Sequence, residues 1–279
     1  MNRRSALLVL AAGFAPAQER ALHLRARRRE AALPGSDLTR TVQEDLHWPT
    51  KATAIIVCDM WDGHYCQASK RRVEEMAPKM NQVLHAARRL GVTIIHAPSG
   101  TMDVYEGMPQ RKRMQDAKLA TPPVEIAKWC YHDPKSEAAL PIDDQTEPCD
   151  DDVVGERVRR YTRQNALLDI EAPDGISDSG QEIYNYCEQE GIRNIVLMGV
   201  HLNMCVLGRP FGIRQQVRLG RSVVLARDLT DSMYDPRQKP YVSHDRGTAL
   251  MVEHVERYWC PSIDSEDLTR LATGRPKRT

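Results

Sequence analysis

Residues 51–59 read KATAIIVCD, a run of apolar and β-branched residues that ends in an acid. Such a run is typical of a strand buried on both faces of a parallel sheet. In residues 71–90 the apolar positions recur every three or four residues, which predicts an amphipathic helix that ends at Gly91. Residues 92–97, VTIIHA, predict a second buried strand. The three segments form one strand–helix–strand unit, which predicts parallel pairing of its strands.

Strands and helices alternate again toward the C-terminus. Ser179 and Glu182 have the spacing of a capping box, which indicates that a helix begins there. The further expected elements are a weak strand at residues 153–161, strands at 194–200 and 222–226, and helices at 205–219 and 248–258. This alternation predicts an α/β fold with a Rossmann-like, doubly wound, mostly parallel sheet and helices on both faces.

The chain of 279 residues has room for one large α/β domain. We place this domain at residues 51–262, with an insertion or long loop at about 99–152, where Pro, Asp and Lys interrupt the pattern. Residues 18–50 are expected to be an N-terminal extension and residues 263–279 a C-terminal tail.

Residues 1–17 have the features of an export signal. Arg3 and Arg4 precede a short apolar run, and Ala15-Pro16-Ala17 has the form of a cleavage site. This interpretation predicts an exported protein, periplasmic or extracellular; the alternative is a simple apolar tail. No other stretch approaches the roughly 18 apolar residues that a membrane span needs.

The charges nearly balance, with a formal net charge of +1. No overall field therefore attracts nucleic acid or a membrane surface, and we expect neither as a partner. The most basic run, Arg25 to Arg29, is expected to be a solvated tail, because it lacks the interleaved aromatic residues of single-strand binders.

The chain has seven cysteines, an odd number that leaves at least one thiol unpaired. None of them forms a Cys-x-x-Cys pair, so a zinc ribbon is not indicated. Cys58 and Cys187 lie in apolar patterns and are expected in the core. Cys130 and Cys149 flank an irregular region and are candidates for a disulfide, which the sequence leaves open.

Polar residues gather where three of the expected strands end. In an open parallel sheet, ligands bind beyond the carboxyl ends of the strands, at the point where the strand order reverses. Asp59 and Asp62 follow the first strand and His96 ends the second, while His201 and Cys205 follow the strand at 194–200. Asp59 and Cys205 meet if the first strand and this later strand are neighbours.

The two end motifs, DMWD at residues 59–62 and GVHLNMCV at 199–206, together resemble the isochorismatase-like cysteine hydrolases, a family that includes nicotinamidases and carbamoyl-amide hydrolases. The resemblance covers roughly Lys51 to Cys260. It implies a catalytic triad of Asp, Lys and Cys and a non-proline cis peptide before the cysteine. In this sequence it implies Asp59 as the proton-transfer residue, Cys205 as the nucleophile, and a cis bond between Val200 and His201.

The position of Cys205 at the expected start of a helix also favours a thiolate, because backbone N–H groups and the positive end of the helix dipole stabilise negative charge. The triad lysine, however, has no counterpart in residues 156–164, ERVRRYTRQ. We expect Arg157 or Arg160 to supply the catalytic cation instead. Arginine stays protonated, so it stabilises charge but hardly moves protons. The alternative is that this stretch is a solvated edge.

Other polar residues near these strand ends are expected to contact the substrate. His64, Cys66 and His96 are candidate metal ligands, but the family's usual Asp-x-His element is missing, so we predict neither a metal nor a cofactor. Arg209 and Arg214 are as consistent with the surface or a dimer contact as with substrate binding. The expected substrate-binding set is Trp61, Asp62, His64, His96, Val200 and His201.

Together these features predict a cysteine hydrolase that cleaves an amide or carbamoyl C–N bond of a small molecule through a thioester on Cys205, in a homo-oligomer. The alternative is a non-catalytic or altered homologue that binds a small molecule and lacks the triad lysine.

Overall fold

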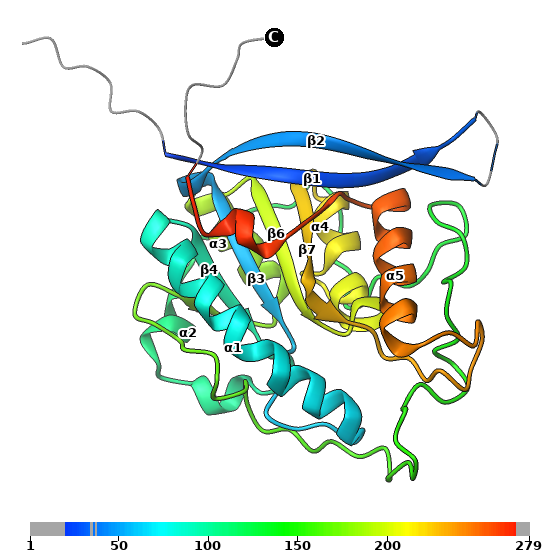
Figure 1. Ribbon diagram of the computed structural model, residues 1–279. Helices are drawn as coiled ribbons and strands as arrows, with labels where there is room; N and C mark the ends of the chain where they lie inside the picture. Colours follow the sequence, from blue (N-terminus) through cyan, green and yellow to red (C-terminus); the bar gives the residue numbers. More distant parts are fainter. Residues whose placement is uncertain (1–19, 34–35, 37, 272–279) are drawn as a thin grey trace, which may run out of the picture.

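The computed structural model describes residues 20–33, 36 and 38–271 (Figure 1), so the expected signal peptide lies outside the described residues. An eight-stranded sheet has the order β2-β1-β8-β7-β6-β3-β4-β5. Its strands are β1 (Ala21–Ala31), β2 (Thr39–Pro49), β3 (Thr53–Cys58), β4 (Thr93–Ala97), β5 (Gly175–Ile176), β6 (Asn194–Val200), β7 (Ser222–Asp231) and β8 (Ser262–Ile263).

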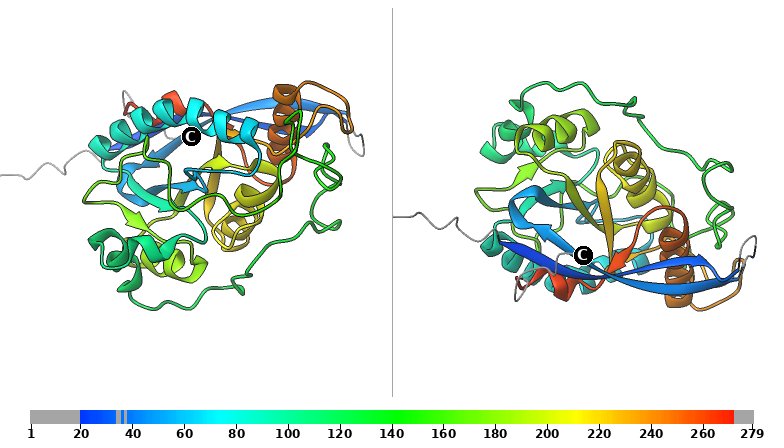
Figure 2. Two further views of the ribbon diagram at one scale, coloured as in Figure 1. Left: turned by 90° about the horizontal axis from the view of Figure 1, so that it is seen from below. Right: turned by 90° about the horizontal axis from the view of Figure 1, so that it is seen from above.

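Helices cover both faces of this sheet, as the alternation predicts. The α-helices are α1 (Gln67–Leu90), α2 (Pro109–Gln115), α3 (Gly180–Gln189), α4 (Ile213–Arg218) and α5 (His244–Tyr258). Figure 2 shows α1 on one side of the sheet and α2, α3 and α4 on the other. The apolar side chains of α5 belong to the same core cluster as those of α2, α3 and α4. Among the described residues, no helix is both long and apolar enough to cross a membrane.

β3 is buried at all of its positions because it packs against helices on both faces. Ile55 and Val57 pack in the core cluster that contains α1, whereas Ile56 and Cys58 pack in the cluster that contains α3. This alternation follows from the twofold repeat of side chains along a strand. The predicted doubly wound α/β sheet is therefore confirmed.

The strand order reverses between β3 and β6. From β3 the chain proceeds to β4 and β5 on one side, and then returns to β6, β7 and β8 on the other. β3 and β6 are parallel neighbours, with Cys58 opposite Gly199. The residues that follow these two strands, Asp59 and His201, therefore begin their loops at the same edge of the sheet.

Two local predictions about helix ends are confirmed. α1 ends at Gly91, whose φ of 93° lies in the left-handed region that glycine adopts without steric cost. The Ser179 hydroxyl oxygen accepts a hydrogen bond from the Glu182 main-chain nitrogen at 3.3 Å, which is one half of the predicted capping box; the Ser179 main-chain nitrogen donates to the Ser177 hydroxyl oxygen instead.

Two other predicted elements are wrong. Residues 153–161 form no strand; most are exposed and lack the apolar face that a strand needs to pack, and the sheet position beside β4 is taken by β5. The helix expected at 205–219 is interrupted. A π-helical turn at Leu202–Val206 continues as helix to Gly208. The chain then turns through Pro210, which has no N–H to continue a helix, and α4 begins at Ile213.

The N-terminal extension is an ordered hairpin that completes the sheet (Figure 1). β1 pairs antiparallel with β2 along its whole length and with β8 at Arg27. The expectation of a solvated tail at Arg25 to Arg29 is therefore wrong. Arg27 pairs with the buried Glu256 of α5 at 2.7 Å, and Arg25 pairs with the buried Asp267 at 3.0 Å. The start of the expected C-terminal tail is folded as well, since a 3-10 turn at Ser265–Leu268 packs beside β1.

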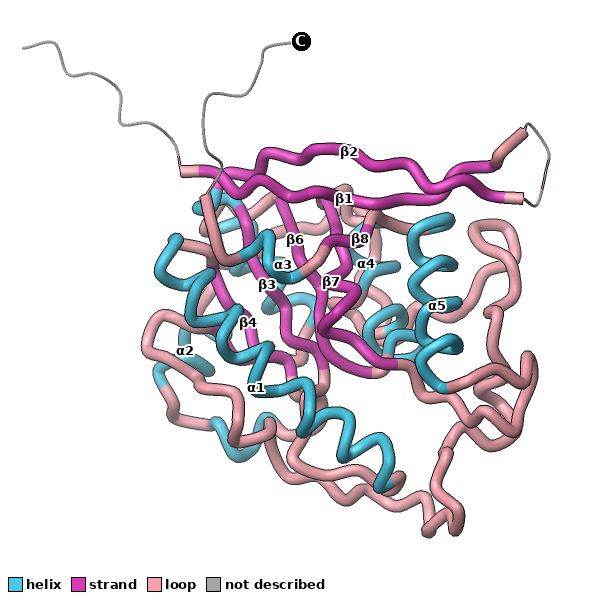
Figure 3. Tube along the Cα trace, in the orientation of Figure 1, coloured by secondary structure: helices cyan, strands magenta, loops and turns pink. Residues whose placement is uncertain are grey.

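After α2 the chain runs without regular structure from residue 116 to 174, a longer irregular segment than the predicted insertion (Figure 3). A disulfide between Cys66 and Cys149 ties this segment to the start of α1. The Asp151 carboxylate accepts hydrogen bonds from the main-chain nitrogens of Gln67 and Ala68, at 2.7 and 2.8 Å, and so caps the same helix. The candidate disulfide between Cys130 and Cys149 is absent, because Cys149 pairs with Cys66 and Cys130 is a free, buried thiol.

We expect reduction of the Cys66–Cys149 disulfide to destabilise the protein. The bond joins residues that are 83 positions apart, and the loss of a cross-link over a loop of that length costs about 4.5 kcal/mol in the chain-entropy model. Urea unfolding with and without reductant measures the change in the free energy of unfolding. Cys149→Ser should abolish the effect of reductant, whereas the matched Cys130→Ser should keep it. The reverse pattern would contradict this pairing.

Candidate active site

Asp59 is the first residue after β3 and is fully buried. Its φ of 48° turns the chain sharply at the strand end, in a region that few residues other than glycine adopt. One carboxylate oxygen accepts a hydrogen bond from the Ser99 main-chain nitrogen at 2.7 Å. The other accepts one from the Arg209 guanidinium at 3.0 Å. These contacts hold a negative charge at the edge of the sheet, where water does not reach it.

Cys205 lies in the π-helical turn that follows β6, and 8% of the residue is exposed. The main-chain nitrogens of Met204 and Val206 both donate to the His201 carbonyl, at 3.0 and 3.1 Å. The bond between Val200 and His201 is cis, as the family resemblance implies. The Cys205 thiol interacts with both the Asp59 carboxylate and the Arg209 guanidinium. The strand order thus brings Asp59 and Cys205 together, as predicted.

Arg209 is the cation that contacts this pair. It follows Cys205 by four residues, and its main-chain nitrogen donates to the Cys205 carbonyl at 3.0 Å. The guanidinium also lies over the Trp129 ring, 5.4 Å from its centroid. Helical spacing therefore directs this side chain back toward Cys205. The four-residue spacing was the available signal in the sequence, but it fits a surface arginine equally well.

In the part of the chain that the structure describes, neither Arg157 nor Arg160 forms an ion pair with Asp59. The segment that carries them forms no strand and runs over the surface, with the Arg160 main chain packed against Gly63. Arg157 is 50% exposed at its side chain and pairs with Glu147 at 2.8 Å, and Arg160 is exposed. Arg209 therefore takes the place beside Cys205 that the sequence led us to expect for one of these two.

The pKa values of Asp59 and Cys205 are coupled. Burial raises the pKa of the Asp59 carboxyl, although Arg209 and the Cys205 thiol oppose this rise. Burial and the neighbouring Asp59 charge raise the pKa of the Cys205 thiol, and Arg209 opposes that rise as well. The direction of the Cys205 shift does not favour the resting thiolate that the sequence led us to expect, so the thiol needs a base, and Asp59 is the neighbouring carboxyl that can serve as one.

Trp61 and Asp62 organise the wall beside this pair. Trp61 is buried and stacks on Tyr161, with ring centroids 4.1 Å apart, and its indole N–H donates to the Ser99 carbonyl at 3.2 Å. Asp62 accepts hydrogen bonds from the Thr162 hydroxyl at 2.6 Å and from its main-chain nitrogen at 2.7 Å. Burial would raise the pKa of Asp62, but these bonds lower it. Asp62 therefore fastens the chain that holds Tyr161 over Trp61.

His64, Val200 and His201 surround a separate small space. Together with Asp59 they line a cavity of about 10 Å³, which is room for at most one water molecule. The buried His201 ring makes a 2.6 Å hydrogen bond with the Ser69 hydroxyl. Burial, followed by the nearby His64, lowers the pKa of His201 to about 3, so its ring is neutral at physiological pH.

His96 is fully buried in β4 and has partners at both ring nitrogens. Nδ1 lies 2.9 Å from the Gln164 side-chain oxygen and Nε2 lies 3.1 Å from the Asp174 carboxylate. The histidine therefore ties the irregular segment to the sheet and does not face the site. The candidate metal ligands His96 and Cys66 are engaged elsewhere, since His96 has these partners and Cys66 is in the disulfide.

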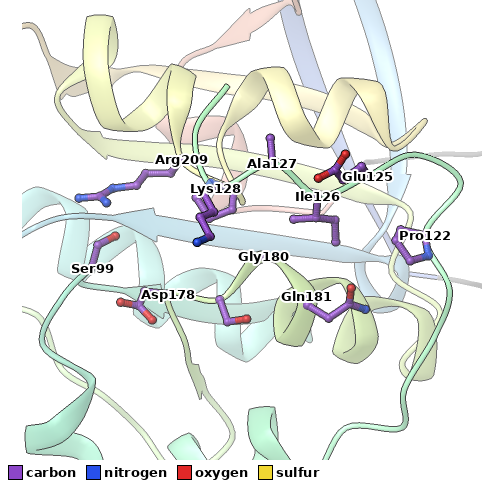
Figure 4. Close-up of a pocket in the computed structure, with 12 residues that line it drawn as sticks. Ser99, Pro122, Glu125, Ile126, Ala127, Lys128, Asp178, Gly180, Gln181 and Arg209 are labelled. Atoms are coloured by element: carbon purple, nitrogen blue, oxygen red, sulfur yellow. The ribbon is translucent and has the colours of Figure 1, made fainter. Parts of the chain in front are cut away.

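A larger cavity of about 570 Å³ opens beside the Arg209 end of the site (Figure 4). The first turn of α3 forms one wall, and the irregular segment around residues 122–128 forms another. The sequence did not predict this cavity, because its wall comes from a segment without a periodic hydrophobic pattern. The residues that line it are Ser99, Pro122, Glu125, Ile126, Ala127, Lys128, Asp178, Ser179, Gly180, Gln181, Arg209 and Pro210.

Residues 53–241 match the family model of the isochorismatase domain. The chain belongs to the isochorismatase family. This membership, which confirms the resemblance seen in the sequence, supports a hydrolase that acts on a small molecule.

Solved structures of this family resemble the chain at low sequence identity. A cysteine hydrolase from Pseudomonas syringae pv. phaseolicola is 16% identical over 79% of this chain and 92% of its own, with a TM-score of 0.49. An N-carbamoylsarcosine amidase from Thermoplasma acidophilum is 11% identical over 77% and 96%, with a TM-score of 0.40. A search of curated proteins finds no match. Likenesses this distant carry no information on the substrate.

We expect Arg209→Met to slow alkylation of Cys205 by iodoacetamide about tenfold at pH 8. Loss of the guanidinium removes the charge that lowers the pKa of Cys205, and one pKa unit changes the thiolate fraction tenfold. Arg209→Lys should keep most of the rate. Cys205→Ala gives the background from the other thiols, and Arg157→Met and Arg160→Met are the matched controls. If alkylation slows in Arg160→Met and stays unchanged in Arg209→Met, the assignment of Arg209 as the cation beside Cys205 is wrong.

We also expect His201 to make the protein acid-sensitive. Its folded pKa of about 3 lies below the unfolded value of about 6.5, so the unfolded chain binds the extra proton between these pH values. The free energy of unfolding should therefore fall as the pH drops below 6.5, by up to about 1.4 kcal/mol per pH unit. Urea unfolding at pH 4.5, 5.5 and 6.5 should give a flatter dependence for His201→Gln, but not for the exposed His47→Gln. Equal slopes for His201→Gln and the wild type would refute this.

Proposed function

We propose that the protein is a cysteine hydrolase that cleaves an amide or carbamoyl C–N bond of a small molecule through a thioester on Cys205. The observation that carries the proposal is the contact of Cys205 with a buried Asp59 and with Arg209, at the edge of the sheet where the strand order reverses. Nucleophile, base and fixed cation lie together beside an open cavity, which is the arrangement that activates a thiol. Family membership supports the hydrolase class.

In the first half of the reaction, Asp59 takes the proton of the Cys205 thiol while the sulfur attacks the substrate carbonyl carbon. The tetrahedral intermediate collapses and the C–N bond breaks. Asp59 passes its proton to the leaving nitrogen, and the acyl group remains on sulfur as a thioester. We assign the oxyanion to the main-chain N–H of Cys205.

In the second half, water hydrolyses the thioester. Asp59 takes a proton from the attacking water, the C–S bond breaks, and the sulfur regains a proton as the acid product leaves. A carboxylate whose pKa is raised by burial is a better base than an ordinary one. The Arg209 charge opposes the rise in the pKa of Asp59 that burial causes, and this role needs a cation that stays charged and does not transfer protons.

The rival function is small-molecule binding without catalysis. One observation favours it: the pKa of the Cys205 thiol is raised, so the resting thiol is not a free thiolate. The missing triad lysine gives this rival function less support, because Arg209 supplies a cation in contact with Asp59. The two functions differ in whether an acyl group becomes attached to Cys205.

We further propose that the protein is exported. The Cys66–Cys149 disulfide supports this, because disulfides persist mainly in oxidising compartments. The expected homo-oligomer stays a prediction.

We expect intact-mass spectrometry to detect an acyl adduct on Cys205 when the protein is mixed with a panel of small amides and carbamoyl compounds and quenched in acid. Asp59→Asn should lower kcat/KM for the substrate so found by 10²- to 10⁴-fold, the usual contribution of a general base. Cys205→Ala should form no adduct, whereas Cys187→Ala, which removes another buried thiol, should behave as the wild type. An adduct that persists in Cys205→Ala, or no adduct and no turnover across the panel, would favour the binding protein.

A further inference from the structure

β2 is the outermost strand of the sheet, and one of its edges has no neighbour among the described residues. It comes at the end of the strand order, with β1 beside it. Figure 1 shows β2 along the outer border of the molecule, with β1 between it and the other strands. The hairpin of β1 and β2 lies outside residues 53–241, which match the family domain. This chain therefore adds a long strand edge to that domain.

The register between β1 and β2 shows which main-chain groups face this edge. In an antiparallel pair, alternate residues bond to the neighbouring strand, and the residues between them direct their N–H and C=O groups to the other side. The Thr50 main-chain nitrogen donates to the Arg20 carbonyl at 2.9 Å. At the far end of the hairpin, the Ala32 main-chain nitrogen donates to the Leu38 carbonyl at 2.7 Å. The even-numbered residues of β2 thus bond to β1, and the odd-numbered ones face the free edge.

β2 has few of the features that keep an edge strand unpaired. Natural edge strands are commonly short, bulged or rich in lysine, or they contain proline. The 11 residues of β2 pair with β1 without a bulge, they include no lysine, and Pro49 is the last of them. Just before β2, Leu38 is 74% exposed. The edge is therefore open to another strand, with an apolar side chain at one end.

A second copy of β2 fits this edge in one antiparallel register, about a twofold axis at Val42. Arg40 then lies opposite Glu44 of the second copy. Leu38 lies opposite Leu46, and each of these contacts occurs twice because of the symmetry. These even-numbered positions do not bond across the new contact, so their side chains are the closest together. A shift of the axis by one residue in either direction places Arg40 and Glu44 opposite apolar side chains.

The two charged side chains are accessible for this contact. The Arg40 side chain is 65% exposed, although it pairs with Glu30 of β1 at 3.1 Å. Glu44 has a weaker partner, Arg28, at 4.0 Å. In the proposed register Arg40 lies between two carboxylates, those of Glu30 and of Glu44 from the second copy. Opposite charges directly across an antiparallel pair stabilise it, so the edge is complementary to itself.

We propose that β2 pairs antiparallel with β2 of a second copy of this chain, about a twofold axis at Val42, so that one continuous sheet runs through both copies. The same patch is used on both sides, so the contact closes with two copies. A two-stranded hairpin is only marginally stable in water. Within the described residues, β1 pairs with β8 at Arg27 and not beyond it toward the hairpin tip. The second copy supplies a third strand there.

The first test removes one outward hydrogen-bond donor. Sedimentation velocity of the full chain at micromolar concentration should show a dimer. Gln43→Pro should give a monomer, because the Gln43 N–H faces the free edge and its loss breaks the new ladder without breaking a bond to β1. Gln43→Ala keeps this N–H and should remain a dimer. Circular dichroism checks that both variants keep the fold.

The second test fixes the register. Arg40→Glu and Glu44→Arg each place like charges opposite one another, so each variant alone should dimerise about tenfold more weakly than the wild type. When the two variants are mixed, every such pair becomes Glu opposite Arg, and dimers should form again. Native mass spectrometry identifies them as heterodimers, because the two variants differ in mass.

Three results overturn the proposal. A wild type that sediments as a monomer would mean that the edge is unused or is covered by another segment of this chain. A dimer that persists in Gln43→Pro would mean that the copies meet at another surface. Arg40→Glu and Glu44→Arg proteins that do not prefer each other over themselves would exclude the register about Val42.

Discussion

The structure depends on one buried charge, the Asp59 carboxylate beside the Cys205 thiol. A carboxylate without access to water is costly to ionise unless hydrogen bonds and an opposite charge compensate it. The Ser99 main-chain nitrogen and the Arg209 guanidinium provide that compensation, at 2.7 and 3.0 Å. They come from the ends of different parts of the sheet, so the charge exists only when β3, β4 and β6 are correctly paired. The chemistry of the site therefore depends on correct folding of the sheet.

The irregular segment completes the site without contributing the reacting groups. It is held at several separate points: the Cys66–Cys149 disulfide near the start of α1, the bonds of Asp62 to Thr162, and the bond of Cys130 to Gly208. Each contact joins the segment to a loop at the carboxyl edge of the sheet. A stretch that lacks helices and strands is thereby positioned well enough to wall a cavity, which agrees with the tendency of long ordered loops to carry function.

The sequence predicted the elements that a repeated hydrophobic pattern encodes. The buried runs before Asp59 and before His201 predicted two central strands, and their polar ends predicted that Asp59 and Cys205 meet. Arg209 was harder, because spacing alone does not separate an arginine that folds back on Cys205 from one that faces solvent. The cavity wall and the Cys66–Cys149 pair were beyond prediction, since contacts between irregular segments leave no periodic signal and cysteine counts do not fix connectivity.

The central claim is that burial and the neighbouring Asp59 charge raise the pKa of the Cys205 thiol, so that the thiol keeps its proton until Asp59 takes it. It is tested most directly by the pH dependence of Cys205 alkylation in the wild type and in Asp59→Asn, with the signal of Cys205→Ala subtracted. The account predicts an inflection above the value of about 8.5 for a free thiol in the wild type, and a lower inflection once the Asp59 charge is removed. An inflection well below that value, unchanged by Asp59→Asn, would contradict it.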